Sequence, residues 1–195
     1  FASEKNWQAM EMFSHVDSEL AASLLEEAAK ICESLIAPLN RPSDEQGVWL
    51  ENGDVKTPDG FVNAFQTYAA NGWVGLGGNP DYEGQGMPKM LVTLVEEMLC
   101  SSGCSFSLYS VLTAGAALAI DKHANEALKQ KYLPKMYSGQ WAGAMALTEA
   151  HAGTDLGLIR TKAKPQEDGS YKVTGSKIFI TGGDHDLTEN IVHLV

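Results

Sequence analysis

The sequence predicts an α+β protein in which a helical region comes first and a β-rich region follows. Apolar residues recur at helical spacing through most of the first 140 residues. After Gly139 the pattern changes to short, strand-length apolar runs separated by turn residues. A run of helices followed by a run of strands is typical of segregated α and β regions rather than an alternating α/β sheet. We therefore expect two parts, residues 1–139 and residues 140–195.

The first helix is expected to begin at Asp17 or Ser18, because either side chain can cap a helix, and to end at Pro38. Its apolar positions share one helical face: Leu20, Leu24, Ala28, Ile31, Cys32, Leu35 and Ile36. Residues 41–53 are polar and rich in turn residues, which favours a loop.

Thr57-Pro58 predicts the next helix start, with Thr57 as N-cap, and the helix is expected to run to about Ala70. Residues 73–88 are rich in glycine but lack a phosphate-binding pattern, so they are interpreted as a tight connection. Three further helices are predicted at residues 88–101, 106–119 and 126–136, the second of them apolar on nearly all sides and so central to a bundle.

Strands are expected at residues 141–147, 159–164, 171–173 and 178–180. Gln166–Gly169 contains Asp-Gly, which suits a type I′ hairpin turn. The chain starts with Phe1 and stops at Val195, inside an apolar, strand-like run that begins at Asn190. We interpret this pattern as a fragment of a longer protein, because a domain that ended there would leave a strand edge unpaired.

Composition narrows the class of protein. The net charge of −11 disfavours a nucleic-acid partner, since such a surface repels phosphates. The longest apolar run, Val111 to Ile120, is much shorter than the ~20 residues of a membrane span. Without a signal peptide either, a cytoplasmic protein is expected. The cysteines, Cys32, Cys100 and Cys104, have no metal-type spacing and are expected to be buried free thiols.

The remaining polar residues give little support for a metal site or for a catalytic triad. His15, His123 and His151 have no Cys or Ser nucleophile pattern around them, so a triad is not expected. The spacing of Asp184, His185, Asp186, Glu189 and His193 fits no standard ligand set, so no metal is expected. The lysines of the last helix (Lys129, Lys131 and Lys135) are interpreted as a solvated face.

The most informative segment is Ala144–Asp155, an apolar strand that ends in a turn of small and hydroxyl residues. Gly153 allows a bulky ligand to approach the backbone, and Thr148 and Thr154 place hydroxyls at the two ends of the turn. A second strand with a terminal hydroxyl follows at Lys177–Thr181. Together these segments can hold a flat ring with polar edges, which describes a flavin site.

Residues 146–155 also match a family signature: small, aliphatic, Ser or Thr, Glu, two variable residues, small, Gly, Ser or Thr, Asp. With Lys129–Pro134 and Gly175–Thr181, this pattern resembles the acyl-CoA dehydrogenase family. Ala37–Asn40 and Gly84–Pro88 are similar to a narrower branch that contains the 3-methylmercaptopropionyl-CoA dehydrogenases. The resemblance implies a helical N-terminal domain followed by the start of an antiparallel, β-barrel-like middle domain, with a C-terminal helical domain absent.

The resemblance further implies FAD as cofactor and an acyl-CoA thioester as substrate. The residues that match flavin contacts are Met145, Ala146, Leu147, Thr148, Gly153, Thr154, Phe179, Ile180 and Thr181. Among these, Phe179 matches an aromatic residue that faces the ring, Thr181 a hydroxyl at flavin N5, and Thr154 a residue that also touches the substrate. Tyr109 and Leu112 match the wall of the acyl pocket.

In this family a glutamate of the C-terminal domain removes the α-proton while the β-hydride goes to flavin N5. No residue here matches that base, so the resemblance implies a base glutamate after Val195 and no catalytic residue within the fragment. Glu149 is expected to have a structural role at its turn, and the chain alone to be inactive with little bound flavin.

The resemblance also implies partners for the full-length protein. It implies an electron-transfer flavoprotein as electron acceptor and a homodimer or homotetramer. An oxidase that passes electrons to oxygen, and a non-catalytic helical interaction module, remain alternatives.

Overall fold

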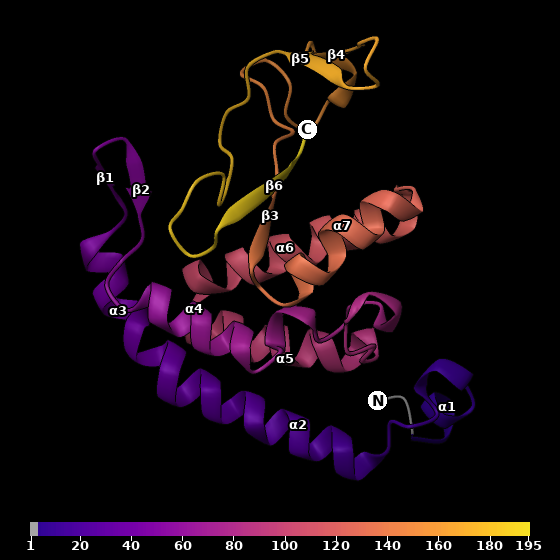
Figure 1. Cartoon of the computed structure of the whole chain (residues 1–195). Coiled ribbons are helices and arrows are strands. Elements are labelled where there is room, and N and C mark those ends of the chain that lie inside the picture. Colours follow the sequence, from indigo (N-terminus) through magenta and orange to yellow (C-terminus); the bar gives the residue numbers. More distant parts are fainter. Residues whose placement is uncertain (1–3) are drawn as a thin grey trace.

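The computed structural model describes residues 4–195, and it places a bundle of helices beneath a small set of strands (Figure 1). The helical elements are α1 (Glu4–Gln8), η1 (Glu11–Phe13), α2 (Ser18–Ile31), the π-helical η2 (Cys32–Ile36), α3 (Ala37–Gln46), α4 (Phe61–Ala70), η3 (Trp73–Gly75), η4 (Pro80–Tyr82), α5 (Lys89–Ser102), α6 (Cys104–His123) and α7 (Glu126–Tyr137). A hairpin of β1 (Trp49–Glu51) and β2 (Asp54–Lys56) separates α3 from α4.

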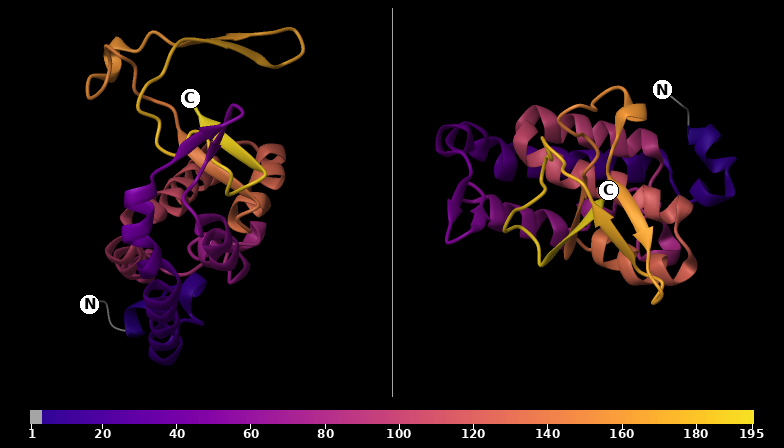
Figure 2. Two further views of the ribbon diagram at one scale, coloured as in Figure 1. Left: turned by 90° about the vertical axis from the view of Figure 1, so that its left-hand side faces the viewer. Right: turned by 90° about the horizontal axis from the view of Figure 1, so that it is seen from above.

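The last third of the chain contains β3 (Trp141–Met145), η5 (Leu156–Leu158), β4 (Lys162–Pro165), β5 (Tyr171–Thr174) and β6 (Asn190–Leu194). β6 pairs in parallel with β3, whereas β4 and β5 form an antiparallel hairpin that projects away from the bundle (Figure 2). The expected order of a helical region followed by β-structure is confirmed.

The helix α6 lies at the centre of the bundle. It packs against α5, α7 and β3, and its fully buried face carries Phe106 and Thr113. Phe106 contacts the ring of Phe61 edge-on at 5.4 Å between centroids. By length and mean hydropathy alone α6 would also suit a membrane span, but its central packing explains the same apolar composition.

Three predictions about helix ends are wrong. Pro38 does not end the first helical segment, because a π-helical turn precedes it and Pro38 then lies in the first turn of α3, where its missing N–H costs nothing. Residues 41–53 are therefore α3 and the β1–β2 hairpin, whose turn residues Asn52 and Gly53 both have positive φ. Thr57 does not cap α4, since Gly60 is the N-cap and Thr57 bonds Asp186 instead.

The β region also departs from expectation in four places. The strand expected at residues 141–147 ends at Met145. Residues 178–180 are not a strand, because Phe179 has a φ of 56° and breaks the extended backbone. The strand expected at residue 159 starts only at Lys162, since η5 precedes it. The hairpin at 166–170 is confirmed, but only Gly169 in its turn has a positive φ, which excludes type I′.

The strand-like run at the end of the sequence forms β6, except for Val195. The register between β3 and β6 ends at the pair Met145 and Leu194, so Val195 lies just outside the strand. Its side chain is 64 % exposed. The expected strand is therefore confirmed from Asn190 to Leu194, and the Ala146 N–H extends its backbone pairing by donating to the Leu194 carbonyl oxygen at 2.8 Å.

The cysteines are free as expected, but only one of them is buried. Cys32 packs into the core, whereas Cys100 and Cys104 are exposed at the junction between α5 and α6. Lys131 and Lys135 of α7 are exposed and Lys129 is half-buried, in agreement with a solvated face. The Lys135 ammonium in addition lies 4.2 Å from the ring centroid of Trp141, and that of Lys131 lies 5.1 Å from the ring centroid of Tyr132.

Candidate flavin site

The strand that leads into the site is held directly on α6. Gly143 lies against α6 so closely that an added Cβ would be 2.5 Å from the Ala116 methyl. The Gly143 N–H donates to the buried Thr113 hydroxyl at 3.0 Å. This contact sets the height of β3 above the helix, and so the position of Met145 and the turn that follows it.

The two segments predicted to form one site lie side by side. The Ile178 N–H donates to the Thr148 carbonyl oxygen at 3.0 Å, and the Lys177 ammonium donates to the Leu147 carbonyl oxygen at 2.9 Å. Residues 146–149 and 177–181 are therefore joined edge to edge. The prediction that they cooperate rested on motifs about 30 residues apart, and the structure brings them into contact.

Glu149 holds this junction from inside. Its carboxylate accepts the backbone N–H groups of Arg160 and Thr161, both at 2.9 Å, and forms an ion pair with Lys177 at 3.0 Å. His151 Nε2 lies 3.2 Å from the same carboxylate. The turn itself is closed by two backbone hydrogen bonds between Glu149 and Ala152. The expected structural role of Glu149 at the turn is consistent with these contacts.

The surroundings of Glu149 hold its pKa far below the usual range of a glutamate. The Thr161 side chain, the N–H groups and Lys177 favour the charged form and together outweigh burial, which opposes it. The Thr161 hydroxyl lies beside the carboxylate without a well-aligned hydrogen bond. The two backbone donors and Lys177 are therefore the contacts that hold the carboxylate in place.

The opposite side of the junction is open and carries an exposed aromatic ring. Phe179 is 88 % exposed and has a φ of 56°, a conformation that costs a non-glycine residue about 1–2 kcal/mol. Thr154, Thr181 and Met145 are also exposed, and each lies in one of the segments that meet here or close to it in sequence. Around Gly153 an added Cβ would meet no atom within 4 Å, so the backbone there is accessible.

Unused polar groups gather on these same segments. Within residues 4–195 the hydroxyls of Thr148, Thr154 and Thr181 form no protein hydrogen bond, and neither do the backbone N–H groups of Leu147 and Thr148. A flat ring with hydrogen-bonding edges and an apolar face needs donors, hydroxyls and an aromatic wall. The residues present therefore fit the flavin of FAD.

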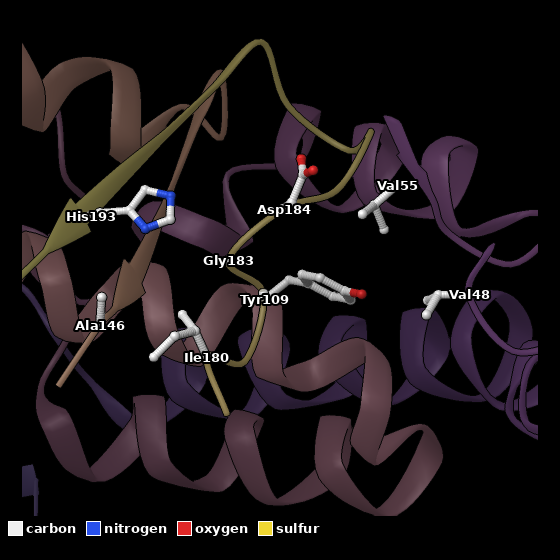
Figure 3. A pocket seen from close by; sticks show the side chains of 9 residues that line it. Val48, Val55, Tyr109, Ala146, Ile180, Gly183, Asp184 and His193 are labelled. Carbon is white, nitrogen blue, oxygen red and sulfur yellow. The ribbon is translucent and has the colours of Figure 1, made fainter. Parts of the chain in front are cut away.

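Two of the predicted flavin contacts line a groove along α6. Ala146 is buried and Ile180 half-buried, and both line a groove of about 560 Å³ with Tyr109 at its centre (Figure 3). Val48 and Val55 of the β1–β2 hairpin lie at one end of the groove. Leu112 instead lines a smaller cavity of about 90 Å³ beside Met145. Tyr109 and Leu112 thus belong to adjoining hollows along α6.

Sequence reasoning missed the loop that fixes the second segment to the helices. The Asp186 carboxylate accepts the hydroxyl of Thr57 at 2.7 Å and its N–H at 3.1 Å. The buried His185 ring packs edge-on against the Tyr109 ring, with 5.0 Å between the ring centroids. Burial lowers the pKa of His185. No group of three metal-ligating side chains is placed to bind an ion in the part of the chain that the structure describes.

Comparisons with known proteins identify the family to which this fold belongs. The family described as acyl-CoA dehydrogenase, N-terminal domain, matches residues 18–140. Butyryl-CoA dehydrogenase from Megasphaera elsdenii has the same fold, with a TM-score of 0.73 and 27 % identity, over 85 % of this chain and 42 % of that one. An acyl-CoA dehydrogenase from Geobacillus kaustophilus superimposes with a TM-score of 0.74 at 25 % identity, over 92 % of this chain and 43 % of that one.

This chain belongs to the acyl-CoA dehydrogenase family. It is 42 % identical to the 3-methylmercaptopropionyl-CoA dehydrogenase of Ruegeria pomeroyi over 96 % of its own length and 32 % of that protein. A butyryl-CoA dehydrogenase of Syntrophomonas wolfei is 41 % identical, over 85 % of this chain and 28 % of that protein. The chain thus spans about a third of the length of these curated relatives.

Proposed function

We propose that this chain supplies one wall of the active site of an FAD-dependent acyl-CoA dehydrogenase. The proposed reaction removes hydrogen from Cα and Cβ of an acyl-CoA thioester and yields the trans-2-enoyl-CoA. The observation that carries the proposal is the exposed Phe179 ring at positive φ, joined through the 146–149 and 177–181 contact to unused hydroxyl and N–H groups. Strain and exposure in one aromatic residue are typical of a site shaped for a ligand.

Each residue of the open face has a proposed role. Phe179 packs on the ring of the flavin and excludes water from it. The N–H groups of Leu147 and Thr148, with the Thr148 hydroxyl, stabilise negative charge at the pyrimidine edge. The Thr181 hydroxyl would orient the ring by a hydrogen bond at its redox-active centre, while Gly153 and Thr154 would leave room for the thioester end of the substrate. FAD, when bound, supplies the hydride acceptor.

We propose no catalytic base within this chain. Glu149 is unsuited because its carboxylate is ion-paired, buried and bonded to two backbone N–H groups, and because its pKa is held low. A general base needs free access to the substrate proton and a pKa nearer the working pH. In the proposal the base is a glutamate that follows Val195 in the full-length protein.

Strand β6 runs along the proposed substrate wall, since its residue His193 lines the groove described above. The proposed base itself lies outside the 195 residues of this sequence.

The groove along α6 is the proposed place for the acyl chain. Ala146 and Ile180 connect it to the flavin segments, and Tyr109 and the hairpin valines extend it away from them. Leu112 borders the neighbouring hollow and completes the same helix face. A cavity of this volume is in the range that accommodates a small ligand.

For electron transfer we propose an electron-transfer flavoprotein as the acceptor, in a cytoplasmic homo-oligomer. The oxidase alternative differs only in giving electrons to oxygen. The interaction-module alternative predicts a protein without cofactor.

The test is the visible spectrum of the full-length protein that contains this chain. Flavin absorbance that bleaches on anaerobic addition of butyryl-CoA is the expected result. A colourless protein, or a flavin that no acyl-CoA reduces, contradicts the proposal. Reoxidation in air with stoichiometric peroxide would favour the oxidase. The 195-residue chain alone is expected to retain little flavin.

A further inference from the structure

We propose that Glu149 and Lys177 are positioning residues that clamp the flavin-facing backbone of residues 147–149. This inference rests on the proposed function, since it assigns a role to residues behind the flavin face rather than on it. The two side chains touch neither the open face nor the groove, and they lie where the two site segments join.

The clamp is buried and shares one carboxylate among separate segments. The Glu149 side chain is 2 % exposed and that of Lys177 is 12 % exposed. One oxygen of Glu149 accepts the Arg160 N–H, and the other accepts the Thr161 N–H and the Lys177 ammonium. The carboxylate thereby ties together its own turn, the entry to β4 and the second flavin segment.

Lys177 extends this connection to the first flavin segment. Its ammonium divides its hydrogen bonds between the Glu149 carboxylate at 3.0 Å and the Leu147 carbonyl oxygen at 2.9 Å. The next carbonyl, that of Thr148, accepts the Ile178 N–H, and the Glu149 N–H donates to Ala152. Three consecutive residues are therefore held, while the N–H groups of Leu147 and Thr148 remain available to a ligand.

Stability alone does not explain an ion pair at this position. Burying two charges costs desolvation energy, and apolar residues of similar size often stabilise a fold equally well. Backbone donors must, however, stay within about 0.5 Å of their working positions to stabilise charge on a ligand. An ion pair that also bonds three backbone groups meets that requirement, because its hydrogen bonds are directional.

The charges of the clamp also predict a signature that packing alone would not produce. Together Glu149 and Lys177 are neutral, so the flavin experiences little net field from them. Glu149→Gln leaves the Lys177 charge uncompensated and favours the reduced, negatively charged flavin, which raises the reduction potential. Lys177→Gln leaves the carboxylate uncompensated and lowers the potential. The two shifts have opposite signs, whereas both variants weaken FAD binding, by about 10- to 100-fold if they act as outer positioning groups do at other sites.

The experiment uses the full-length protein and its FAD complex, with Glu149→Gln, Lys177→Gln and the double variant. Binding is measured by FAD titration, potential by spectroelectrochemistry and folding by far-ultraviolet circular dichroism. The double variant keeps amide groups without buried charge, so it is expected to fold, to bind FAD weakly and to return toward the wild-type potential. If a single variant does not fold, the double variant alone decides.

Asp121→Asn is the matched control. Asp121 is also a buried acid, paired with Lys122 at 2.9 Å and bonded by Asn79 at 2.8 Å, but it lies near the end of α6. This variant is expected to lose stability while FAD affinity and potential stay unchanged. Clamp variants with wild-type affinity, or with potentials that shift in the same direction, overturn the proposal. A wild-type protein without FAD would instead overturn the proposed function.

Discussion

The helical region buries its large side chains, whereas the β region leaves most of its side chains exposed. The ten largest fully buried side chains of the described chain all come from residues 16–136: Phe65, Phe106, Ile36, Leu91, Leu99, Leu133, Met136, Val16, Thr113 and Ser107. Every residue of β4 and β5 is exposed. The comparison teaches that the two regions have different tasks: the helical region buries most of the core, and the β region carries the residues that we propose bind the flavin.

The largest effect on stability is expected from Phe106→Ala in the helical core. Phe106 is 1 % exposed and contacts the rings of Phe61, Phe65 and Tyr68, so truncation leaves a cavity. A loss of about 3–5 kcal/mol in the free energy of unfolding is expected. Urea denaturation followed by circular dichroism measures it. A loss below about 1 kcal/mol would show that the core is not where the stability resides.

A smaller effect is expected at the boundary between the two regions, from Gly143→Ala. The new methyl would lie 2.5 Å from the Ala116 methyl and 3.0 Å from the Met136 side chain, so β3 must lift from α6. Overpacking of this kind costs about 1–3 kcal/mol. Because β3 leads into the site, FAD affinity of the full-length protein should fall as well. Gly153→Ala is the control for the loss of stability alone, since its methyl meets no atom within 4 Å.

Thr57→Val tests the second attachment of the β region. It removes the hydroxyl that donates to Asp186 at 2.7 Å, and about 1–2 kcal/mol is expected to be lost at neutral pH. Burial would raise the pKa of Asp186, but the Thr57 hydroxyl and N–H and the nearby Lys56 hold it below its ordinary value of 3.8.

The pH dependence of this attachment has a definite sign. Because the folded pKa of Asp186 is lowered, its contribution is complete above the unfolded pKa and is lost as the pH falls through that value to the folded one. The difference in unfolding midpoint between wild type and Thr57→Val should therefore be constant above the ordinary aspartate pKa of 3.8 and should shrink as the pH is lowered below that value. A difference that stays constant below that value would contradict the assignment.

The sequence predicts the elements that depend on the local spacing of residues. Apolar periodicity predicts helices α5 and α7, and two motifs predict that residues 146–149 and 177–181 lie together. The passage through Pro38 into α3 was missed because the π-helical turn that precedes it has no clear sequence signal. Asn52-Gly53 was a readable hairpin signal that was overlooked.

The remaining features depend on contacts between distant residues. The bond between Thr57 and Asp186 joins positions 129 residues apart, and it redirects a threonine that would otherwise cap a helix. The role of Lys177 depends on where its ammonium ends up relative to Glu149, 28 residues earlier. Residue type and spacing place such groups on segments, but only the folded backbone decides which of them meet.

The smallest effect on stability, and the sharpest contrast with Phe106, is expected from Phe179→Ala. Both positions carry a phenylalanine, but Phe179 is 88 % exposed and its ring contributes little to burial. The free energy of unfolding should change by less than about 0.5 kcal/mol, since a surface substitution removes few contacts. Phe179→Gly should stabilise slightly, because glycine adopts the positive φ without strain. In the full-length protein both variants should nevertheless bind FAD more weakly and alter its visible spectrum, since they remove the ring that we propose packs on the flavin. If Phe179→Ala lowered the free energy of unfolding and left FAD affinity normal, the ring would contribute to stability and not to cofactor binding. The contrast between the two regions would then be wrong.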